Sequence, residues 1–239
     1  MDLHQYRLAK LRREQEKPVP RGDCLVCRHP PSTCYCDLIQ AFDCSLRFII
    51  LIHPGEVKRK LTTARMAHLC LSNSVFLEGV NFTENKVLNQ ILDDKRNARV
   101  VLFPLEDAID LTPMHTNERK TIFPPDKQPV VIVLDGTWRQ AKRMRRKSEN
   151  LHPFPTIRFT PSSPSNFRIR KQPKEDCYCT IEAIHQLIEL LAPEPDGAHK
   201  NLIQVFNSMV DKQIQFPRTH RNQRVCKRRI QKRLAETPS

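Results

Sequence analysis

Glycine is scarce in this chain of 239 residues, and its scarcity excludes several nucleotide-binding classes. The chain has only five glycines, and no two of them form a G-x-G, so the dinucleotide-binding fingerprint is absent. Neither G-x-x-x-x-G-K-[ST] nor G-x-S-x-G occurs, which excludes P-loop nucleotide hydrolases and the usual nucleophile elbow of hydrolases. A nucleotide-like ligand would have to be held by another loop geometry.

Long apolar runs are also missing. The longest, Phe48–Ile52 and Val130–Leu134, are far shorter than the roughly 20 residues that span a bilayer. The first 23 residues are charged and contain no apolar core of a secretion signal. We therefore expect a cytoplasmic protein that does not associate with membranes and whose nine cysteines stay reduced. Nothing in the sequence indicates an obligate protein partner.

Positive charge is concentrated in two segments. The net charge is +14; Arg139–Lys147 holds six basic residues and Arg218–Arg233 holds eight, neither with an acidic one, so the rest of the chain is neutral. Concentrated basic patches on a balanced chain favour binding to a polyanion such as RNA. Solvated helix faces that keep the protein soluble are the alternative. Since aromatic residues make up only 6 %, recognition by shape and charge is favoured over base stacking.

The hydrophobic pattern predicts an α/β fold, because apolar runs alternate with segments of helical periodicity. Continuous apolar runs indicate strands buried on both faces, as in a mostly parallel sheet flanked by helices. Strands are expected at Leu46–Ile52, Val75–Val80, Arg99–Phe103, Val130–Leu134 and Thr156–Phe159. Helices are expected at Glu56–Leu71, Lys86–Leu92, Thr137–Lys147, Thr180–Ala192 (with Thr180 as a fair N-cap) and roughly Ala198–Asp211.

Four cysteines cluster near the start of the chain. Cys24 and Cys27 form a C-x-x-C, and Cys34 and Cys36 form a C-x-C after six intervening residues. Four thiolates meet the requirement of a closed zinc site, which has no open position and is therefore structural. Reduced thiols without a metal, or His29 in place of one cysteine, are the alternatives. A second pair, Cys177 and Cys179, cannot close such a site alone, and we expect burial as small apolar residues.

The strongest local signal for a site is Leu134-Asp135-Gly136-Thr137-Trp138, where a buried strand ends and a helix begins. Ligands of open α/β sheets collect beyond the carboxyl ends of strands. Asp135 places an acid there, Gly136 permits a turn or a close approach by ligand, and the helix start offers free N–H donors. Two other interpretations stay open: Asp135 caps the helix, and Trp138 belongs to the core.

The segment Asp135-Gly-Thr-Trp138 resembles the D-x-T-W signature of the DTW-domain family. Five further segments agree in order and spacing: the four cysteines, His53-Pro-Gly-Glu56 (H-P-x-E), Leu102-Phe-Pro104 (L-F-P), Arg168-Ile-Arg170 (R-x-R) and Thr180-Ile-Glu-Ala183 (T-x-E-A). The resemblance covers roughly residues 24 to 190. Within the family it is strongest to the bacterial tRNA-uridine aminocarboxypropyltransferases.

The resemblance implies a function and a fold. Such enzymes transfer the 3-amino-3-carboxypropyl group of S-adenosylmethionine to N3 of a tRNA uridine and release methylthioadenosine. Their catalytic domain is SPOUT-like, a knotted α/β fold. The expected organisation is a polar lead (1–23), a zinc-binding knuckle (24–40), a DTW catalytic domain (44–216) and a basic tail (217–239).

The resemblance also implies roles for particular residues. Asp135 either accepts the uridine N3 proton or holds the amino group or a hydroxyl of the donor, and Thr137 and Trp138 lie beside it. S-adenosylmethionine is expected to contact the loops after several strands, with either Arg168 or Arg170 on its carboxylate. The expected cofactor-binding residues are His53, Pro104, Leu134, Gly136, Thr160, Arg170 and Thr180. The expected RNA-binding residues are Arg139, Lys142, Arg143, Arg145, Arg146 and Lys147, assisted by the basic tail.

Three other functions stay open. A methyltransferase of the same fold would transfer a different group from the same donor, and a related enzyme would modify ribosomal RNA. The third alternative is a zinc-containing RNA-binding protein without catalysis. The stretch from Lys58 to Leu69 also departs from the Thr-Asn-Thr-Gly-like sequence of several relatives, so the target uridine could differ.

Overall fold

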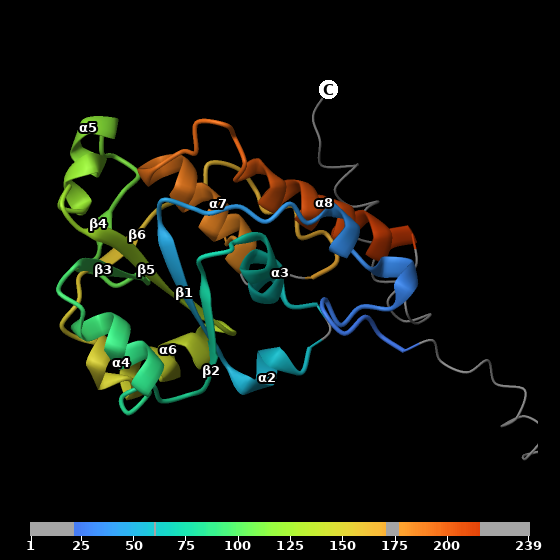
Figure 1. Ribbon diagram of the computed structural model, residues 1–239, viewed down its shortest axis with the longest axis horizontal. Helices are drawn as coiled ribbons and strands as arrows, with labels where there is room; N and C mark the ends of the chain where they lie inside the picture. Colours follow the sequence, from blue (N-terminus) through green and yellow to red (C-terminus); the bar gives the residue numbers. More distant parts are fainter. Residues whose placement is uncertain (1–21, 60, 171–176, 216–239) are drawn as a thin grey trace, which may run out of the picture.

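The computed structural model describes residues 22–59, 61–170 and 177–215. The strands of these residues form one six-stranded sheet in the order β2-β1-β5-β3-β6-β4, and all five neighbouring pairs are parallel (Figure 1). The strands are β1 (Arg47–Ile52), β2 (Val75–Glu78), β3 (Asn97–Leu102), β4 (Ile109–Asp110), β5 (Gln128–Asp135) and β6 (Thr156–Arg158). The predicted parallel sheet is therefore confirmed.

Helices connect the strands and cover both faces of the sheet. The α-helices are α2 (Pro54–Val57), α3 (Thr63–Cys70), α4 (Lys86–Asp93), α5 (Thr116–Arg119), α6 (Trp138–Lys147), α7 (Thr180–Leu191) and α8 (Lys200–Gln215). Short 3₁₀ helices are η1 (Pro31–Thr33), η2 (Cys36–Leu38), η3 (Lys120–Ile122) and η4 (Glu149–Leu151). No helix of the described ranges is both long and apolar enough to cross a membrane.

The sheet lies between two helical layers. Helices α3, α7 and α8 lie on one face, and α4 and α6 lie on the other (Figure 1). Successive residues of β5 alternate between the two cores: Val131 and Val133 pack toward α3, α7 and α8, whereas Val130 and Ile132 pack toward α4 and α6. Burying each such side chain stabilises the fold by about 1.5–3 kcal/mol. This two-sided burial explains why the strand sequences are continuously apolar.

The single helix predicted at 56–71 is wrong, because the chain forms α2 and α3 instead. The backbone of Thr62 is extended, with φ −115° and ψ 99°. Its hydroxyl donates to the carbonyl oxygens of Glu56 at 3.2 Å and Arg59 at 2.8 Å. A threonine hydroxyl that bonds backbone carbonyls competes with helical hydrogen bonds, so periodicity alone could not reveal this break.

Smaller differences concern short elements and helix ends. Strand β4 and helix α5 were not predicted, because two or four residues are too few for a periodic signal. Helix α8 begins and ends later than the predicted range, and the N-cap of α7 is Cys179 rather than Thr180. Thr180 is instead the first helical residue, which leaves its hydroxyl free for another partner.

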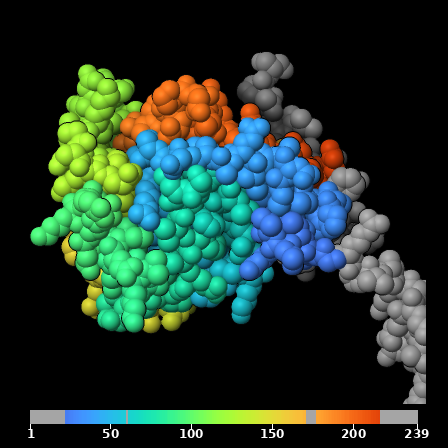
Figure 2. Space-filling model, viewed as in Figure 1, coloured from blue at the N-terminus to red at the C-terminus, as the bar shows by residue number. Residues whose placement is uncertain are grey.

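The predicted knuckle packs against α8. Lys212 of α8 donates from Nζ to the carbonyl oxygen of Cys34 at 2.5 Å, and Gln213 Nε2 lies 3.4 Å from His29 Nδ1. Nearer the start of the helix, the Asn201 amide bonds the backbone of Leu38 and Gln40. Figure 2 shows the N-terminal segment in blue beside the red surface of α8. The four-cysteine segment is therefore held against α8, the last helix of the described residues.

Candidate active site

The candidate site begins where two neighbouring strands end together. The register pairs Ile52, the last residue of β1, with Asp135, the last residue of β5. The backbone N–H of His53 donates to the carbonyl oxygen of Asp135 at 3.0 Å. The segments His53–Glu56 and Asp135–Trp138 therefore start side by side, as the parallel sheet predicts.

The Asp135 carboxylate receives a hydrogen bond from the hydroxyl of Thr180 at the start of α7. Burial raises the pKa of Asp135 from 3.8 to about 6, and the nearby carboxylate of Glu56 acts in the same direction. The Thr180 hydrogen bond and the charges of Arg170 and Arg59 lower the pKa without offsetting that rise. A carboxyl group with this pKa exchanges a proton close to neutral pH.

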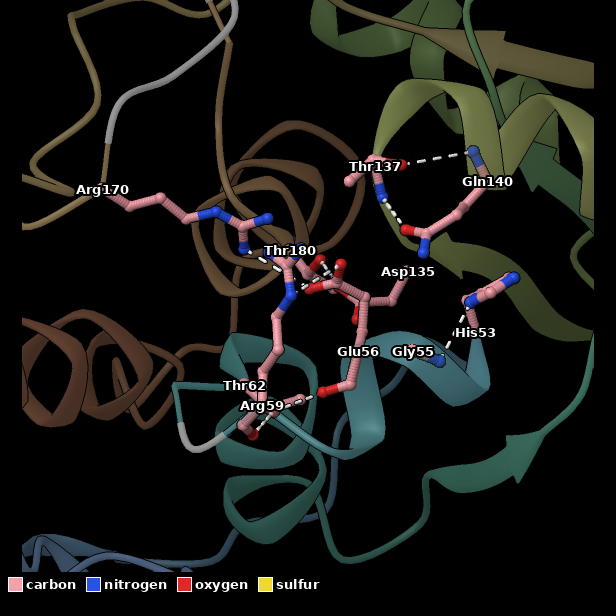
Figure 3. Close-up of polar contacts among 10 residues, drawn as sticks. All are labelled: His53, Gly55, Glu56, Arg59, Thr62, Asp135, Thr137, Gln140, Arg170 and Thr180. Carbon is pink, nitrogen blue, oxygen red and sulfur yellow. Dashed lines mark hydrogen bonds and ion pairs between the residues drawn. The ribbon is translucent and has the colours of Figure 1, made fainter.

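Glu56 is a buried carboxylate beside Asp135 that was not predicted as a site residue. Its side chain is only 5 % exposed and lies between two guanidinium groups, with Arg59 Nε 3.3 Å from Oε1 and Arg170 Nη1 3.5 Å from Oε2 (Figure 3). Its Oε1 has no hydrogen-bond partner among the described residues. The H-P-x-E segment contained this residue, but only the tertiary structure reveals its two partners.

The two arginines of the R-x-R segment point to different places. Arg170 reaches Glu56, whereas Arg168 pairs through Nη2 with the Asp211 carboxylate of α8. Of the two predicted partners for a substrate carboxylate, only Arg170 reaches the cluster around Asp135. Arg168 instead connects its loop to α8.

The start of α6 lies against the start of α2. Thr137 is the N-cap of α6: its backbone N–H donates to Gln140 Oε1 at 2.7 Å, and its Oγ1 accepts from the Gln140 N–H at 3.4 Å. A Cβ on Gly136 would lie 3.0 Å from Gln140 Cβ, and one on Gly55 would lie 3.0 Å from Gln140 Nε2. Both glycines thus permit close approach, while His53 Nδ1 accepts from the Gly55 N–H at 3.0 Å. Neither Gly55 nor Gln140 was predicted as a site residue.

Trp138 does not belong to the core. Its side chain is 42 % exposed, and its ring meets the Phe103 ring edge-on with centroids 6.4 Å apart. Phe103 follows β3, the neighbour of β5 in the sheet. The exposed indole therefore lies at the start of the basic helix α6, beside the end of β3.

Glu182 of the T-x-E-A segment has a structural role that was not predicted. It is 6 % exposed and accepts three hydrogen bonds, from the Ser165 hydroxyl at 2.7 Å and the backbone N–H groups of Asn166 at 2.8 Å and Cys179 at 2.9 Å. The carboxylate therefore fastens the loop that leads to Arg170 onto the start of α7. The same carboxylate holds Cys179, the residue before Thr180.

The other predicted cofactor-binding residues share the carboxyl edge of the sheet. Leu134 is half-buried near the end of β5. Pro104 is exposed after β3, next to β5, whereas Thr160 is exposed after β6, one strand further away. The backbone N–H of Thr160 donates to Thr112 Oγ1 at 2.8 Å. Thr160 is thus the predicted residue that follows the strand furthest from Asp135 in the sheet.

Helix α6 presents a basic surface next to Trp138. Five of its six basic residues are exposed, whereas Arg145 is half-buried. Burial lowers the pKa of Arg145, and the negative charge of Asp107 partly offsets this effect. The exposed residues are Arg139, Lys142, Arg143, Arg146 and Lys147. The second basic segment, Arg218–Arg233, lies outside the described residues.

The four predicted cysteines converge. Cys24 Sγ lies 3.7 Å from Cys36 Sγ, Cys27 Sγ lies 3.6 Å from Cys34 Sγ, and all four sulfur atoms are within 4.8 Å of one another. Tetrahedral zinc with Zn–S bonds of about 2.3 Å requires sulfur–sulfur distances of about 3.8 Å, so the cluster fits this metal. Backbone N–H groups lower the pKa of Cys24 to about 7, whereas burial raises the pKa of Cys27 and Cys36, so the fit to zinc rests on the distances between the sulfur atoms.

His29 is not one of the converging ligands. Its ring is 1 % exposed and meets the ring of Tyr35 edge-on at 5.1 Å, next to Gln213. The possible metal ligands of the knuckle are the four cysteines. The second pair, Cys177 and Cys179, consists of half-buried free thiols, with Cys179 capping α7.

A parallel sheet with an acid, a capped helix and two arginines paired with Glu56 at its carboxyl edge defines an α/β protein of the open-sheet class. Comparison of the sequence with family models shows which one: the DTW domain model matches residues 21–214. The chain belongs to the DTW-domain family.

Curated relatives come from animals and a plant. The chain is 30 % identical over 189 residues to "tRNA-uridine aminocarboxypropyltransferase 2" of Drosophila melanogaster, covering 76 % of this chain and 71 % of the relative. A protein of the same name from Macaca fascicularis is 26 % identical over 175 residues, covering 72 % of this chain but 57 % of the relative. "tRNA-uridine aminocarboxypropyltransferase A" of Arabidopsis thaliana is 24 % identical over 231 residues, covering 85 % of each. No solved structure matches the chain.

Proposed function

We propose that this protein is a tRNA-uridine aminocarboxypropyltransferase. It transfers the 3-amino-3-carboxypropyl group of S-adenosylmethionine to N3 of a uridine in tRNA and releases methylthioadenosine. The observation that carries the proposal is the contact between Asp135 and Thr180, which joins the D-x-T-W and T-x-E-A segments in one site. The family match and the printed names of the relatives support the same activity.

The charges at the site suit the donor molecule. Its transferred group carries an ammonium and a carboxylate, and its sulfur is a cation. Arg170, which pairs with Glu56 in this structure, would bind the carboxylate, while Glu56 and Asp135 would supply negative charge for the cationic centres. The buried Glu56 Oε1 lies 3.3 Å from Arg59 Nε but accepts no hydrogen bond from the described residues, which fits an additional donor such as an ammonium group.

The reaction forms one bond and breaks another. When bound, the sulfonium supplies a neutral thioether leaving group, and the orientation of the donor selects which of its three carbons is attacked. Uracil N3 becomes nucleophilic as it loses its proton, and the new N–C bond forms as the C–S bond breaks. Asp135 is the acceptor of that proton, because a carboxylate with a pKa of about 6 is ionised at neutral pH.

Binding of tRNA is assigned to the exposed basic surface of α6. Arginine and lysine side chains at this position would contact phosphates and set the register of the RNA over the strand edge. Trp138, which is exposed, is assigned to the catalytic site beside Asp135 and Thr137. The basic tail is assigned the same role, although it lies outside the described residues.

The remaining features complete the proposal. The four-cysteine knuckle binds structural zinc, and His53, Pro104, Leu134, Gly136 and Thr160 line the approach of the donor. The catalytic domain, residues 44–216, is SPOUT-like and knotted, and the protein acts in the cytoplasm. The all-parallel sheet supports the fold, and the convergent sulfur atoms support the zinc site. The eight free thiols of the described residues support a reducing compartment such as the cytoplasm.

The experiment uses two preparations of S-adenosylmethionine with purified protein and unmodified tRNA. One preparation carries a label in the carboxyl carbon and the other in the methyl group. Incorporation of carboxyl label alone is expected. Mass spectrometry of the digested tRNA then locates the modified uridine.

Other results would overturn the proposal. Methyl label alone would make the protein a methyltransferase. Carboxyl label that enters ribosomal RNA but not tRNA would correct the substrate. If neither label enters either RNA, a zinc-containing RNA-binding protein without catalysis becomes the better description.

A further inference from the structure

A second group of possible metal ligands lies where α7 connects to α8. His185 and Glu189 are four residues apart on α7 and therefore share one face of the helix. His199 precedes α8 and places Nε2 2.7 Å from Glu189 Oε1, while His185 Nε2 lies 3.7 Å from the same oxygen. One ligand atom from each residue lies within 4.8 Å of the others.

An ion pair accounts for only part of this arrangement. One imidazole satisfies the Glu189 oxygen at 2.7 Å, but the second, at 3.7 Å, is too far for a hydrogen bond. The rings of His185 and His199 lie 5.5 Å apart between centroids, so two protonated imidazoles would repel each other.

Burial and access also suit a metal. The His199 side chain is 3 % exposed. Glu189 is 38 % exposed and His185 is 21 % exposed, so one side of the group is open to solvent. An ion held here would have rigid ligands from the protein and room for water.

We propose that His185, Glu189 and His199 bind a zinc ion, with water in the fourth position. Two imidazoles and one carboxylate form a ligand set that zinc commonly takes, whereas calcium and magnesium prefer oxygen ligands alone. The ion cross-links α7 to the start of α8 across the connecting segment, in which Gly197 has φ +71°. Lys212, which contacts Cys34, lies about 20 Å from His199 along the axis of α8. The two metal sites are therefore separate.

The test measures the binding of zinc and cobalt to the full-length chain. Zinc bound per chain is determined by mass spectrometry after dialysis against buffered zinc. We expect the wild type to hold one zinc ion more than the cysteine site needs. We also expect His185→Ala and Glu189→Gln to weaken binding of that ion by more than about 100-fold, because each removes a direct ligand. The His152→Ala variant, which removes an exposed histidine elsewhere, is the matched control and retains the ion.

Cobalt distinguishes the two sites in the same protein. Cobalt at the cysteine site produces thiolate-to-metal charge-transfer absorption, whereas cobalt at the proposed site adds visible bands without it. Both variants should keep the charge-transfer absorption, which shows that they are folded, and lose the additional bands. Equal zinc content and equal spectra in the wild type and both variants would overturn the proposal and leave a histidine–glutamate ion pair.

Discussion

The Thr180 hydroxyl donates a hydrogen bond to the Asp135 carboxylate across 45 residues of sequence. One partner begins helix α7 and the other ends strand β5. The bond lowers the pKa of Asp135, opposing the larger effect of burial. A neutral side chain on another element therefore contributes to the pKa of the candidate base.

Replacing Thr180 should move the pH dependence of the reaction. In Thr180→Val the carboxylate loses its hydrogen-bond donor, so the pKa of Asp135 should rise above about 6. The acid limb of the pH–rate profile should shift upward, with little change in the rate at high pH. Thr180→Ser keeps the hydroxyl and is the control. Identical profiles for the valine and serine variants would remove Asp135 from the rate-limiting ionisation.

Asp135→Asn should stabilise the protein at neutral pH while reducing transfer. Because the folded pKa of about 6 exceeds 3.8, ionisation of Asp135 disfavours the folded state. This cost is absent below about pH 3.8, grows with pH and is complete above about pH 6. At pH 7.5 the variant should gain up to about 3 kcal/mol in the free energy of unfolding. The gain should shrink as the pH falls toward 4.5. Denaturant titrations at both pH values test this, and a less stable variant at pH 7.5 would contradict it.

Glu182→Gln should reduce both stability and donor binding. The amide presents N–H groups where Ser165, Asn166 and Cys179 all donate, so buried donors are left without an acceptor. A loss of about 2–3 kcal/mol lowers the melting temperature by roughly 5–10 °C for a chain of this size. The KM for S-adenosylmethionine should rise, since the loop leading to Arg170 loosens. Glu149→Gln, at an exposed position, is the control, and unchanged values for Glu182→Gln would refute the role of this carboxylate.

Exposed arginines of α6 should set the salt dependence of tRNA binding. In the double variant Arg143→Ala with Arg146→Ala, the affinity should fall. The slope of log K against log salt should become shallower by about 0.7–0.9 for each phosphate that the protein no longer neutralises. Arg96→Ala, which removes an exposed arginine paired with Asp94, should leave the slope unchanged. Filter-binding titrations between low and physiological salt provide both values, and an unaltered slope in the double variant would place the RNA elsewhere.

Removal of the knuckle zinc should loosen the end of α8. A chelator or Cys36→Ser takes away the metal that holds the cysteines together, and Lys212 and Gln213 of α8 contact that segment. The melting temperature should fall by on the order of 5–10 °C, and amide exchange should accelerate near the end of α8. Cys177→Ser removes a thiol outside the cluster and is the control. Unchanged exchange in α8 after zinc removal would show that the knuckle folds independently of it.

Much of the fold could be predicted because its signals are local. Continuous apolar runs predicted five of the six described strands, and the helical spacing of Ile181, Ile184 and Ile188 predicted α7. The break at Thr62 could not be predicted, since it depends on a hydroxyl that meets two carbonyl oxygens of an earlier turn. The two arginines of the R-x-R segment were equivalent in the sequence, and only the packing of α8 and α2 separated their partners.

The sequence by itself determined the parallel α/β class, the position of Asp135 at a strand end and the four cysteines of the knuckle. Each of these follows from residue type and short spacing, which act through local periodicity and ligand chemistry. The tertiary structure decided which distant groups contact one another. Thr180 donates a hydrogen bond to Asp135, Arg170 pairs with Glu56, and His199 pairs with Glu189. Such pairs depend on how helices pack against the sheet, because burial and charge act through space rather than along the chain.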